Sequence, residues 1–137
     1  MAGAKELKEI GGDFHLLYVE DDEKLREDTL RLLSTFFPSI TVAVNGKEAL
    51  EKYRSGSYDF VISDLIMPLM NGRELTRQIK SINPEQMVVI LSAHDEMPIV
   101  KELKEAGVDF FIFKPLEISQ FINTLVEVCQ KIRGQTP

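Results

Sequence analysis

The chain of 137 residues has no tryptophan, one cysteine and two histidines. Cys129 has no second cysteine to pair with, so an internal disulfide bond is excluded. One cysteine and two distant histidines also do not make up the ligand set of a zinc site. Cysteine usage of this kind is typical of a reducing compartment, and we expect the chain to be cytoplasmic.

Long apolar runs and an excess of basic residues are missing as well. No stretch approaches the roughly 18 apolar residues of a membrane-spanning helix, and the first residues, MAGAKELKEIGG, lack the apolar region of a signal peptide. The 16 Lys and Arg residues are outnumbered by 22 Asp and Glu, which gives a formal net charge of −6. Because non-specific nucleic-acid binding depends on Lys and Arg, we expect no direct nucleic-acid binding. Because no stretch is long and apolar enough to span a bilayer, we also expect no membrane association.

Short apolar runs alternate with amphipathic segments over residues 14–133. This alternation predicts βα units, and hence an α/β domain whose parallel sheet is covered on both faces. We predict a single domain of about five strands and five helices in three layers. Residues 1–13 and 134–137 are interpreted as an N-terminal extension and a C-terminal tail, because both are too short and too polar to form further domains.

Four of the apolar runs end on polar residues. The runs are Phe14–Val19, Tyr58–Ser63, Met87–Leu91 and Phe110–Phe113, and they are followed by Glu20-Asp21-Asp22, Asp64, Ser92 and Lys114 respectively. Neighbouring parallel strands end at the same edge of a sheet, where ligands bind in this class of fold. Each residue alone has an ordinary explanation, such as a helix cap. Their joint placement predicts one site with several carboxylates, a hydroxyl group and an ammonium group.

Such a carboxylate cluster needs relief of its negative charge. Two carboxylates about 5 Å apart repel each other by roughly 3 kcal/mol at an effective dielectric constant near 20. Either one carboxyl group takes up a proton or a cation binds. Mg²⁺ suits the site best because it accepts one or two carboxylates and keeps water or phosphate oxygens; the spacing of a calcium loop is absent. With the cation in place Asp64 is a candidate nucleophile toward phosphorus, assisted by Lys114 and Ser92.

At these residues the chain resembles the receiver domain of bacterial two-component response regulators. The resemblance covers residues 14–133. The matching stretches, in the order and spacing of the family, are Leu17-Tyr18-Val19-Glu20-Asp21-Asp22, Ser63-Asp64-Leu65-Ile66-Met67-Pro68 with Asn71-Gly72, Leu91-Ser92-Ala93 and Phe113-Lys114-Pro115. One such motif is unspecific, whereas the ordered set is specific. The resemblance implies a flavodoxin-like, doubly wound sheet with the strand order 2-1-3-4-5.

The resemblance also implies a role for each site residue. Asp64 would accept a phosphoryl group from a sensor histidine kinase or a phosphotransfer protein, with Mg²⁺ as the cofactor and Mn²⁺ as a substitute. The metal ligands would be Asp21, Asp64, Glu20 (partly through water) and the backbone carbonyl of Ile66. Ser92 and Lys114 would bind the phosphoryl oxygens. The bond between Lys114 and Pro115 would be cis, as only about 5–6% of X–Pro bonds are.

In the resembled family, signal output uses a Ser or Thr at the position of Ser92 and an aromatic switch residue. Phe111 stands at the position of that aromatic residue, which is often a tyrosine, and phenylalanine cannot make the contact of the tyrosine hydroxyl. The face made by the fourth helix, fifth strand and fifth helix would act on an unknown protein target or a missing output domain, and would allow a homodimer. Met97, Ile99 and Phe111 are expected either to give this face an apolar patch or to make ordinary core contacts. Ile66 and His94 fall at the two variable positions that, in the resembled family, tune the lifetime of the acyl phosphate.

Other classes of protein match the sequence less well. A phosphohydrolase of the haloacid-dehalogenase type needs a second Asp two positions after the nucleophile, where Ile66 stands. A pseudo-receiver scaffold usually lacks part of the acid pocket, and flavodoxin has a Ser/Thr- and Gly-rich phosphate loop where this chain has three acids. We therefore expect a phosphorylated switch rather than an enzyme with turnover of its own.

Overall fold

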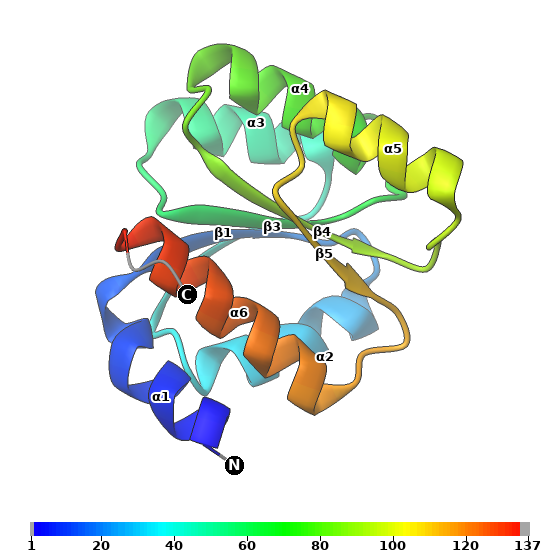
Figure 1. Ribbon diagram of the computed structural model, residues 1–137. Helices are drawn as coiled ribbons and strands as arrows, with labels where there is room; N and C mark the ends of the chain where they lie inside the picture. Colours follow the sequence, from blue (N-terminus) through cyan, green and yellow to red (C-terminus); the bar gives the residue numbers. More distant parts are fainter. Residues whose placement is uncertain (1, 135–137) are drawn as a thin grey trace.

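The computed structural model describes residues 2–134 and contains one parallel β-sheet (Figure 1). Its strands are β1 (His15–Val19), β2 (Ser39–Ala43), β3 (Phe60–Asp64), β4 (Met87–Ser92) and β5 (Phe110–Phe113). They are arranged in the order β2-β1-β3-β4-β5. The predicted flavodoxin-like order is confirmed, and the winding direction reverses between β1 and β3, where a ligand site is expected.

The helices cover the sheet on both faces and complete the three layers. They are α1 (Ala2–Ile10), α2 (Glu23–Ser34), α3 (Gly46–Ser55), α4 (Gly72–Ile82), α5 (Met97–Ala106) and α6 (Ile118–Ile132). Figure 1 shows α3, α4 and α5 on one face and α1, α2 and α6 on the other. Loops at one edge of the sheet therefore connect every strand that carries a predicted site residue to the helix that follows it.

Strand β1 shows how the sequence builds two cores on one sheet. Successive side chains of a strand point to opposite faces, so Leu16 and Tyr18 join the apolar cluster beneath α2 and α6. Leu17 and Val19 join the cluster beneath α3, α4 and α5. All four side chains are fully buried. The nearly continuous apolar sequence of this strand follows from its burial on both faces.

Aspartate or asparagine side chains cap three of the helices that follow strands, namely α2, α3 and α4. Asp22 accepts a hydrogen bond from the Leu25 N–H at the start of α2, and Asn71 accepts one from the Glu74 N–H at the start of α4. These caps satisfy amide groups that a helix cannot pair internally. They also fix short connections directly after β1 and close to the end of β3, which limits how far the acidic residues there can move.

The expectation of five helices omits α1, which the structure adds as a sixth within residues 2–134. Leu7 of α1 is fully buried in the cluster beneath α2 and α6, and Ala4 and Ile10 pack against the same cluster. The carboxylate of Glu6 accepts a hydrogen bond from the Gln130 side chain at 3.0 Å. The polar composition of this segment hid its single apolar stripe. The described part of the predicted extension, residues 2–13, therefore packs on α6 through helix α1.

Two further expectations concern the C-terminal tail and membrane-spanning helices. The predicted tail, residues 134–137, lies outside the described residues apart from Gly134. None of the helices within residues 2–134 has the length and apolar character needed to span a bilayer.

Candidate functional site

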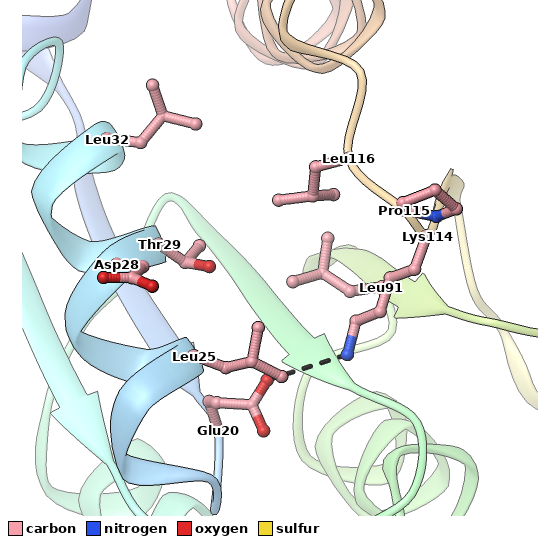
Figure 2. A pocket seen from close by; sticks show the side chains of 9 residues that line it. All are labelled: Glu20, Leu25, Asp28, Thr29, Leu32, Leu91, Lys114, Pro115 and Leu116. Atoms are coloured by element: carbon pink, nitrogen blue, oxygen red, sulfur yellow. Dashed lines mark ion pairs between the residues drawn. The ribbon is translucent and has the colours of Figure 1, made fainter.

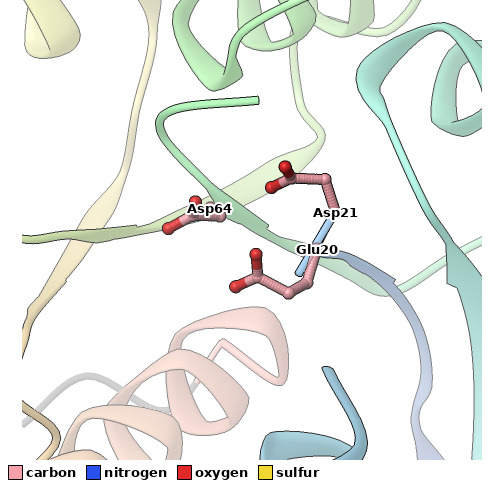
Figure 3. Close-up of side chains that lie close together, drawn as sticks. All are labelled: Glu20, Asp21 and Asp64. Carbon is pink, nitrogen blue, oxygen red and sulfur yellow. The ribbon is translucent and has the colours of Figure 1, made fainter. Parts of the chain in front are cut away.

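The predicted acidic residues meet at the carboxyl edge of β1 and β3. These strands are neighbours, with Val19 paired to Ser63, so the residues that follow, Glu20 and Asp64, lie side by side. Figure 3 shows the side chains of Glu20, Asp21 and Asp64 gathered in one place, and one carboxylate oxygen of each lies within 4.8 Å of the others. Glu20 and Asp64 are buried and Asp21 is exposed. Two of the three carboxylates are therefore largely removed from the solvent that would screen their charges.

Lys114 brings a positive charge to this cluster from the far end of β5. Its Nζ atom lies 2.5 Å from Oδ1 of Asp64 and 3.8 Å from Oε1 of Glu20. The backbone N–H of Lys114 donates to the carbonyl oxygen of Ser92 on the adjacent strand, which extends the pairing of β4 and β5 to this residue. The peptide bond that follows, Lys114–Pro115, is cis.

Glu20 is the residue whose protonation this environment alters most clearly. Only 2% of it is exposed. Burial raises the pKa of Glu20 to about 7, the negative charge of Asp64 adds to the rise, and a hydrogen bond from the Asp22 N–H opposes it. Lys114 also lowers this pKa but does not outweigh the other effects. One lysine thus leaves the three carboxylates short of positive charge.

The chemistry of this donor set suits a small divalent cation. Carboxylate oxygens are hard ligands, and Mg²⁺ binds proteins through one or two of them. Glu20, Asp21 and Asp64 offer three such oxygens close together. A cation among them would offset both causes of the raised Glu20 pKa, the burial of the carboxyl group and the repulsion from Asp64. The residues present therefore fit Mg²⁺, with Mn²⁺ as an ion of the same ligand preference.

Arg26 contacts this site and was missed by the sequence analysis. Arg26 lies in the first turn of α2, and its Nη1 atom donates to the carbonyl oxygens of Glu20 at 3.0 Å and Asp21 at 3.3 Å. The only signal in the sequence is an arginine a few residues after an acidic strand end, and arginine is common on exposed helix surfaces. Its direction toward the turn is fixed by the packing of α2 on the sheet.

Ser92 is buried at the end of β4, but its hydroxyl group bonds within its own loop. It accepts a hydrogen bond from the His94 N–H at 2.9 Å and lies 3.0 Å from the His94 carbonyl oxygen, to which it donates. The His94 ring lies 3.6 Å from the Glu96 carboxylate. Neither Ser92 nor His94 has a hydrogen bond to Asp64 among the described residues. A contact between Ser92 and a bound phosphoryl group would need rotation of the hydroxyl.

The residues predicted to act in signal output or to tune the phosphate lifetime differ in how far they are exposed to solvent. Phe111 is half-buried against the cluster beneath α3, α4 and α5, with its ring stacked on that of Phe113 at a centroid distance of 6.1 Å. Met97 is 77% exposed and Ile99 is half-buried. Ile66, two residues after Asp64, is 65% exposed. The predicted apolar patch is therefore divided between an exposed methionine and two side chains that also make core contacts.

A cavity of about 320 Å³ adjoins the acidic cluster on the side of α2. Figure 2 shows Leu25, Thr29 and Leu32 of α2 on one side of it and Lys114, Pro115 and Leu116 on the other. Its lining is mostly apolar, and the Glu20–Lys114 ion pair closes one end. Lys114 is thus held between the acidic cluster and an apolar hollow.

The family model for the response regulator receiver domain matches residues 16–126 of this chain. The chain belongs to this family. The match covers every residue of the acidic cluster together with Ser92 and Lys114. The resemblance predicted from the four motifs is confirmed.

Relatives with curated descriptions place the receiver domain in several protein contexts. This chain is 37% identical to the chemotaxis protein CheY of Thermotoga maritima over 86 residues. The match covers 63% of this chain and 72% of that protein. The chain is also 37% identical over 103 residues to a cyclic di-GMP phosphodiesterase of the same organism, which covers 75% of this chain. The chain spans 27% of that phosphodiesterase and 47% of a transcriptional regulatory protein, YkoG, of Bacillus subtilis.

Solved structures show the same fold. The N-terminal domain of an uncharacterized protein from Wolinella succinogenes is similar with a TM-score of 0.79 and 29% identity, over 90% of this chain and 99% of that one. A complex titled CheX-CheY-BeF3-Mg from Borrelia burgdorferi contains a chain similar with a TM-score of 0.78 and 28% identity, over 84% of this chain and 88% of that one.

Proposed function

We propose that this receiver domain is a switch that accepts a phosphoryl group on Asp64, and that a divalent cation is required. The observation that carries the proposal is the joint placement of three carboxylates within 4.8 Å and the Lys114 ammonium group 2.5 Å from Asp64. A carboxylate held beside a fixed cation and a metal-ligand set is the arrangement needed for phosphoryl transfer to oxygen.

The proposed transfer uses Asp64 as the nucleophile. A carboxylate oxygen of Asp64 attacks the phosphorus atom of a phosphohistidine on a sensor kinase or phosphotransfer protein. An O–P bond forms while the P–N bond breaks, and the histidine nitrogen leaves with the electron pair of that bond and takes up a proton. Support for such a partner comes from the 30% identity over 125 residues to a protein named sensor kinase CckA from Brucella abortus.

The other residues hold the phosphoryl oxygens and the metal. Glu20, Asp21 and Asp64 would hold Mg²⁺, joined by the carbonyl of Ile66. Bound Mg²⁺ supplies positive charge that offsets the charge of the carboxylates and of the phosphoryl group. Lys114 moves its ammonium group from the Asp64 carboxylate to a phosphoryl oxygen, and Ser92 turns its hydroxyl from the His94 carbonyl to another. The transfer of these two contacts connects the site to the loop after β4 and to β5.

The output of the switch would come from the face of α5, β5 and α6. Phe111 lies on β5 three residues before Lys114, so a shift of Lys114 reaches the half-buried ring directly along the strand. This face would bind a protein target, an output domain or a second copy of the chain. The domain would have no turnover beyond gaining and losing its phosphate, and would act in the cytoplasm. Nucleic-acid contacts would belong to other domains.

A direct test is incubation of the protein with acetyl phosphate and Mg²⁺, followed by intact mass measurement. We expect wild type to gain the mass of one phosphoryl group and Asp64→Asn to gain none, because the substitution removes the attacking carboxylate. EDTA should abolish the gain in wild type. Asp95→Asn, which changes an exposed acid in the loop after β4, is the matched control and should be phosphorylated normally. A phosphorylated Asp64→Asn variant would refute the assignment.

A further inference from the structure

Arg26 is placed behind the acidic turn rather than inside the acidic pocket. Its guanidinium group binds the backbone carbonyl oxygens of Glu20 and Asp21 through one nitrogen, at 3.0 and 3.3 Å. None of the ion pairs found among residues 2–134 pairs it with a carboxylate. The side chain is half-buried. Arg26 therefore donates to the backbone of the residues that carry the acids, and not to their carboxylate oxygens.

The turn from Glu20 to Asp22 is fixed unevenly by its other hydrogen bonds. The Glu20 N–H donates to the Ala43 carbonyl on β2 at 3.1 Å. The Asp22 N–H donates to the Glu20 carboxylate, and the Asp22 side chain caps α2. Asp21 lies between these two fixed points, and its carbonyl is held by Arg26. The peptide between Asp21 and Asp22 keeps the hydrogen bond from its N–H to the Glu20 carboxylate when Arg26 is removed. The peptide between Glu20 and Asp21 loses the bond to its carbonyl oxygen, and it is then the part of the turn most free to rotate.

Rotation of that peptide matters because Asp21 is the exposed member of the cluster. Glu20 and Asp64 are kept in place by burial, whereas the direction of the Asp21 side chain depends on its backbone. A metal ion bound by several ligands gains affinity when those ligands are already oriented, since binding then loses less conformational entropy. A hydrogen bond from a charged donor is strong enough to hold such a turn.

We propose that Arg26 is a positioning residue that sets the divalent-cation affinity of the site by fixing the Glu20 and Asp21 backbone. This inference rests on the proposed function, because it assigns the affinity of the same acidic site to a residue outside it. Arg26 touches neither the cation nor the phosphoryl group. Its effect is therefore on the strength of metal binding and not on the phosphoryl transfer itself.

The test is titration of the full chain with Mg²⁺ by isothermal calorimetry for wild type, Arg26→Met, Arg26→Lys and Arg31→Met. We expect Arg26→Met to weaken Mg²⁺ binding about tenfold, as the loss of one charged hydrogen bond would. Arg26→Lys keeps the charge but not the planar set of donors, so it should also bind more weakly than wild type. Arg31, a highly exposed arginine of the same helix, is the matched control, and Arg31→Met should bind Mg²⁺ like wild type.

A kinetic measurement separates positioning of the metal site from a general loss of structure. The rate of phosphorylation by acetyl phosphate, followed against Mg²⁺ concentration, should reach the wild-type maximum in Arg26→Met at about tenfold higher Mg²⁺. An unchanged Mg²⁺ affinity in Arg26→Met, full affinity in Arg26→Lys, or a lowered maximal rate would each overturn the inference. If Arg26→Met does not fold, as seen by circular dichroism, Arg26→Gln replaces it. Failure of wild type to bind Mg²⁺ would instead refute the proposed function.

Discussion

Glu20 and Asp21 are adjacent in sequence but differ in how the fold treats them. Glu20 is buried, accepts the Asp22 N–H and has a pKa raised to about 7, whereas Asp21 is exposed. A buried carboxyl group with a raised pKa needs a compensating charge more than an exposed one does. The two acids therefore contribute differently: ionised Glu20 is unfavourable unless a positive charge compensates it, and Asp21 offers a ligand on the exposed side of the cluster.

Ile66 provides a prediction at the same scale. Its exposed apolar side chain follows Asp64 by two residues, where it would hinder the water molecule that hydrolyses an acyl phosphate. Ile66→Asn supplies an amide that can hydrogen-bond this water. We expect dephosphorylation to be about tenfold faster, which corresponds to about 1.4 kcal/mol of barrier and the strength of one hydrogen bond. Loss of radiolabelled phosphate from the isolated phosphoprotein measures the rate.

Leu69→Asn is the matched control for this prediction. Leu69 is another exposed apolar residue of the same loop, at 78% exposure, but it stands five residues from Asp64. Its substitution should leave the dephosphorylation rate unchanged. Equal rates for wild type and Ile66→Asn would show that Ile66 does not set the lifetime.

At the scale of secondary structure, α1 shows that a short polar segment can belong to the core. It packs on α6, with Leu7 buried among residues of several other elements. An ion pair between Asp13 and Arg133 and the Glu6–Gln130 hydrogen bond join the two ends of the chain. Helix α6 forms part of the proposed output face, and the packing of α1 on α6 stabilises that helix.

We predict that Leu7→Ala lowers the free energy of unfolding by about 2–4 kcal/mol, the usual cost of removing a fully buried leucine side chain. Urea denaturation followed by circular dichroism measures the change. Lys8→Ala, one residue further on the exposed side of α1, should change it by less than about 0.5 kcal/mol. Equal stability of the two variants would mean that α1 does not pack on α6 in solution.

At the scale of the whole molecule, the sheet divides the protein into a rigid interior and a functional edge. Two apolar clusters occupy its faces, and the carboxylates collect where β1 and β3 end. The folding free energy of the interior holds like charges together at the edge. This cost depends on pH, because a protonated Glu20 relieves part of the repulsion.

The raised pKa of Glu20 predicts the direction of that dependence. The folded protein keeps a proton on Glu20 up to about pH 7, whereas the ordinary value is 4.5. Its contribution to stability is fully present below about pH 4.5 and is lost as the pH rises through about 7. In EDTA we therefore expect the free energy of unfolding to fall between about pH 5 and pH 8, by on the order of 2 kcal/mol.

Urea titrations across this pH range test the prediction. Saturating Mg²⁺ should remove most of the fall, because the cation stabilises the ionised carboxylate and binds only the folded chain. Glu20→Gln, which has no proton to lose at this position, should also show a shallower fall in EDTA. A variant with the wild-type slope would assign the pH dependence to other groups.

The sequence by itself predicted the membership of the acidic cluster, and its resemblance to the receiver family implied the sheet order. Parallel strands joined by helices end at one edge, so the residues after the apolar runs had to meet there. The presence of Glu20, Asp21, Asp64 and Lys114 in one place was therefore predictable, as was the position of Ser92 nearby. The direction of the Ser92 hydroxyl toward His94 was not, because a hydroxyl rotates to whichever acceptor its loop presents.

Tertiary structure alone decided the roles of Arg26 and α1. Arg26 is five residues from Asp21, and one arginine on a helix surface carries no pattern until the packing of that helix directs its side chain to the turn. Leu7 is a single leucine in a polar segment, and its burial depends on α6, more than a hundred residues away in the chain. Short-range patterns predict which residues stand at the carboxyl ends of the strands. Side-chain contacts between distant elements form only once the helices have packed on the sheet.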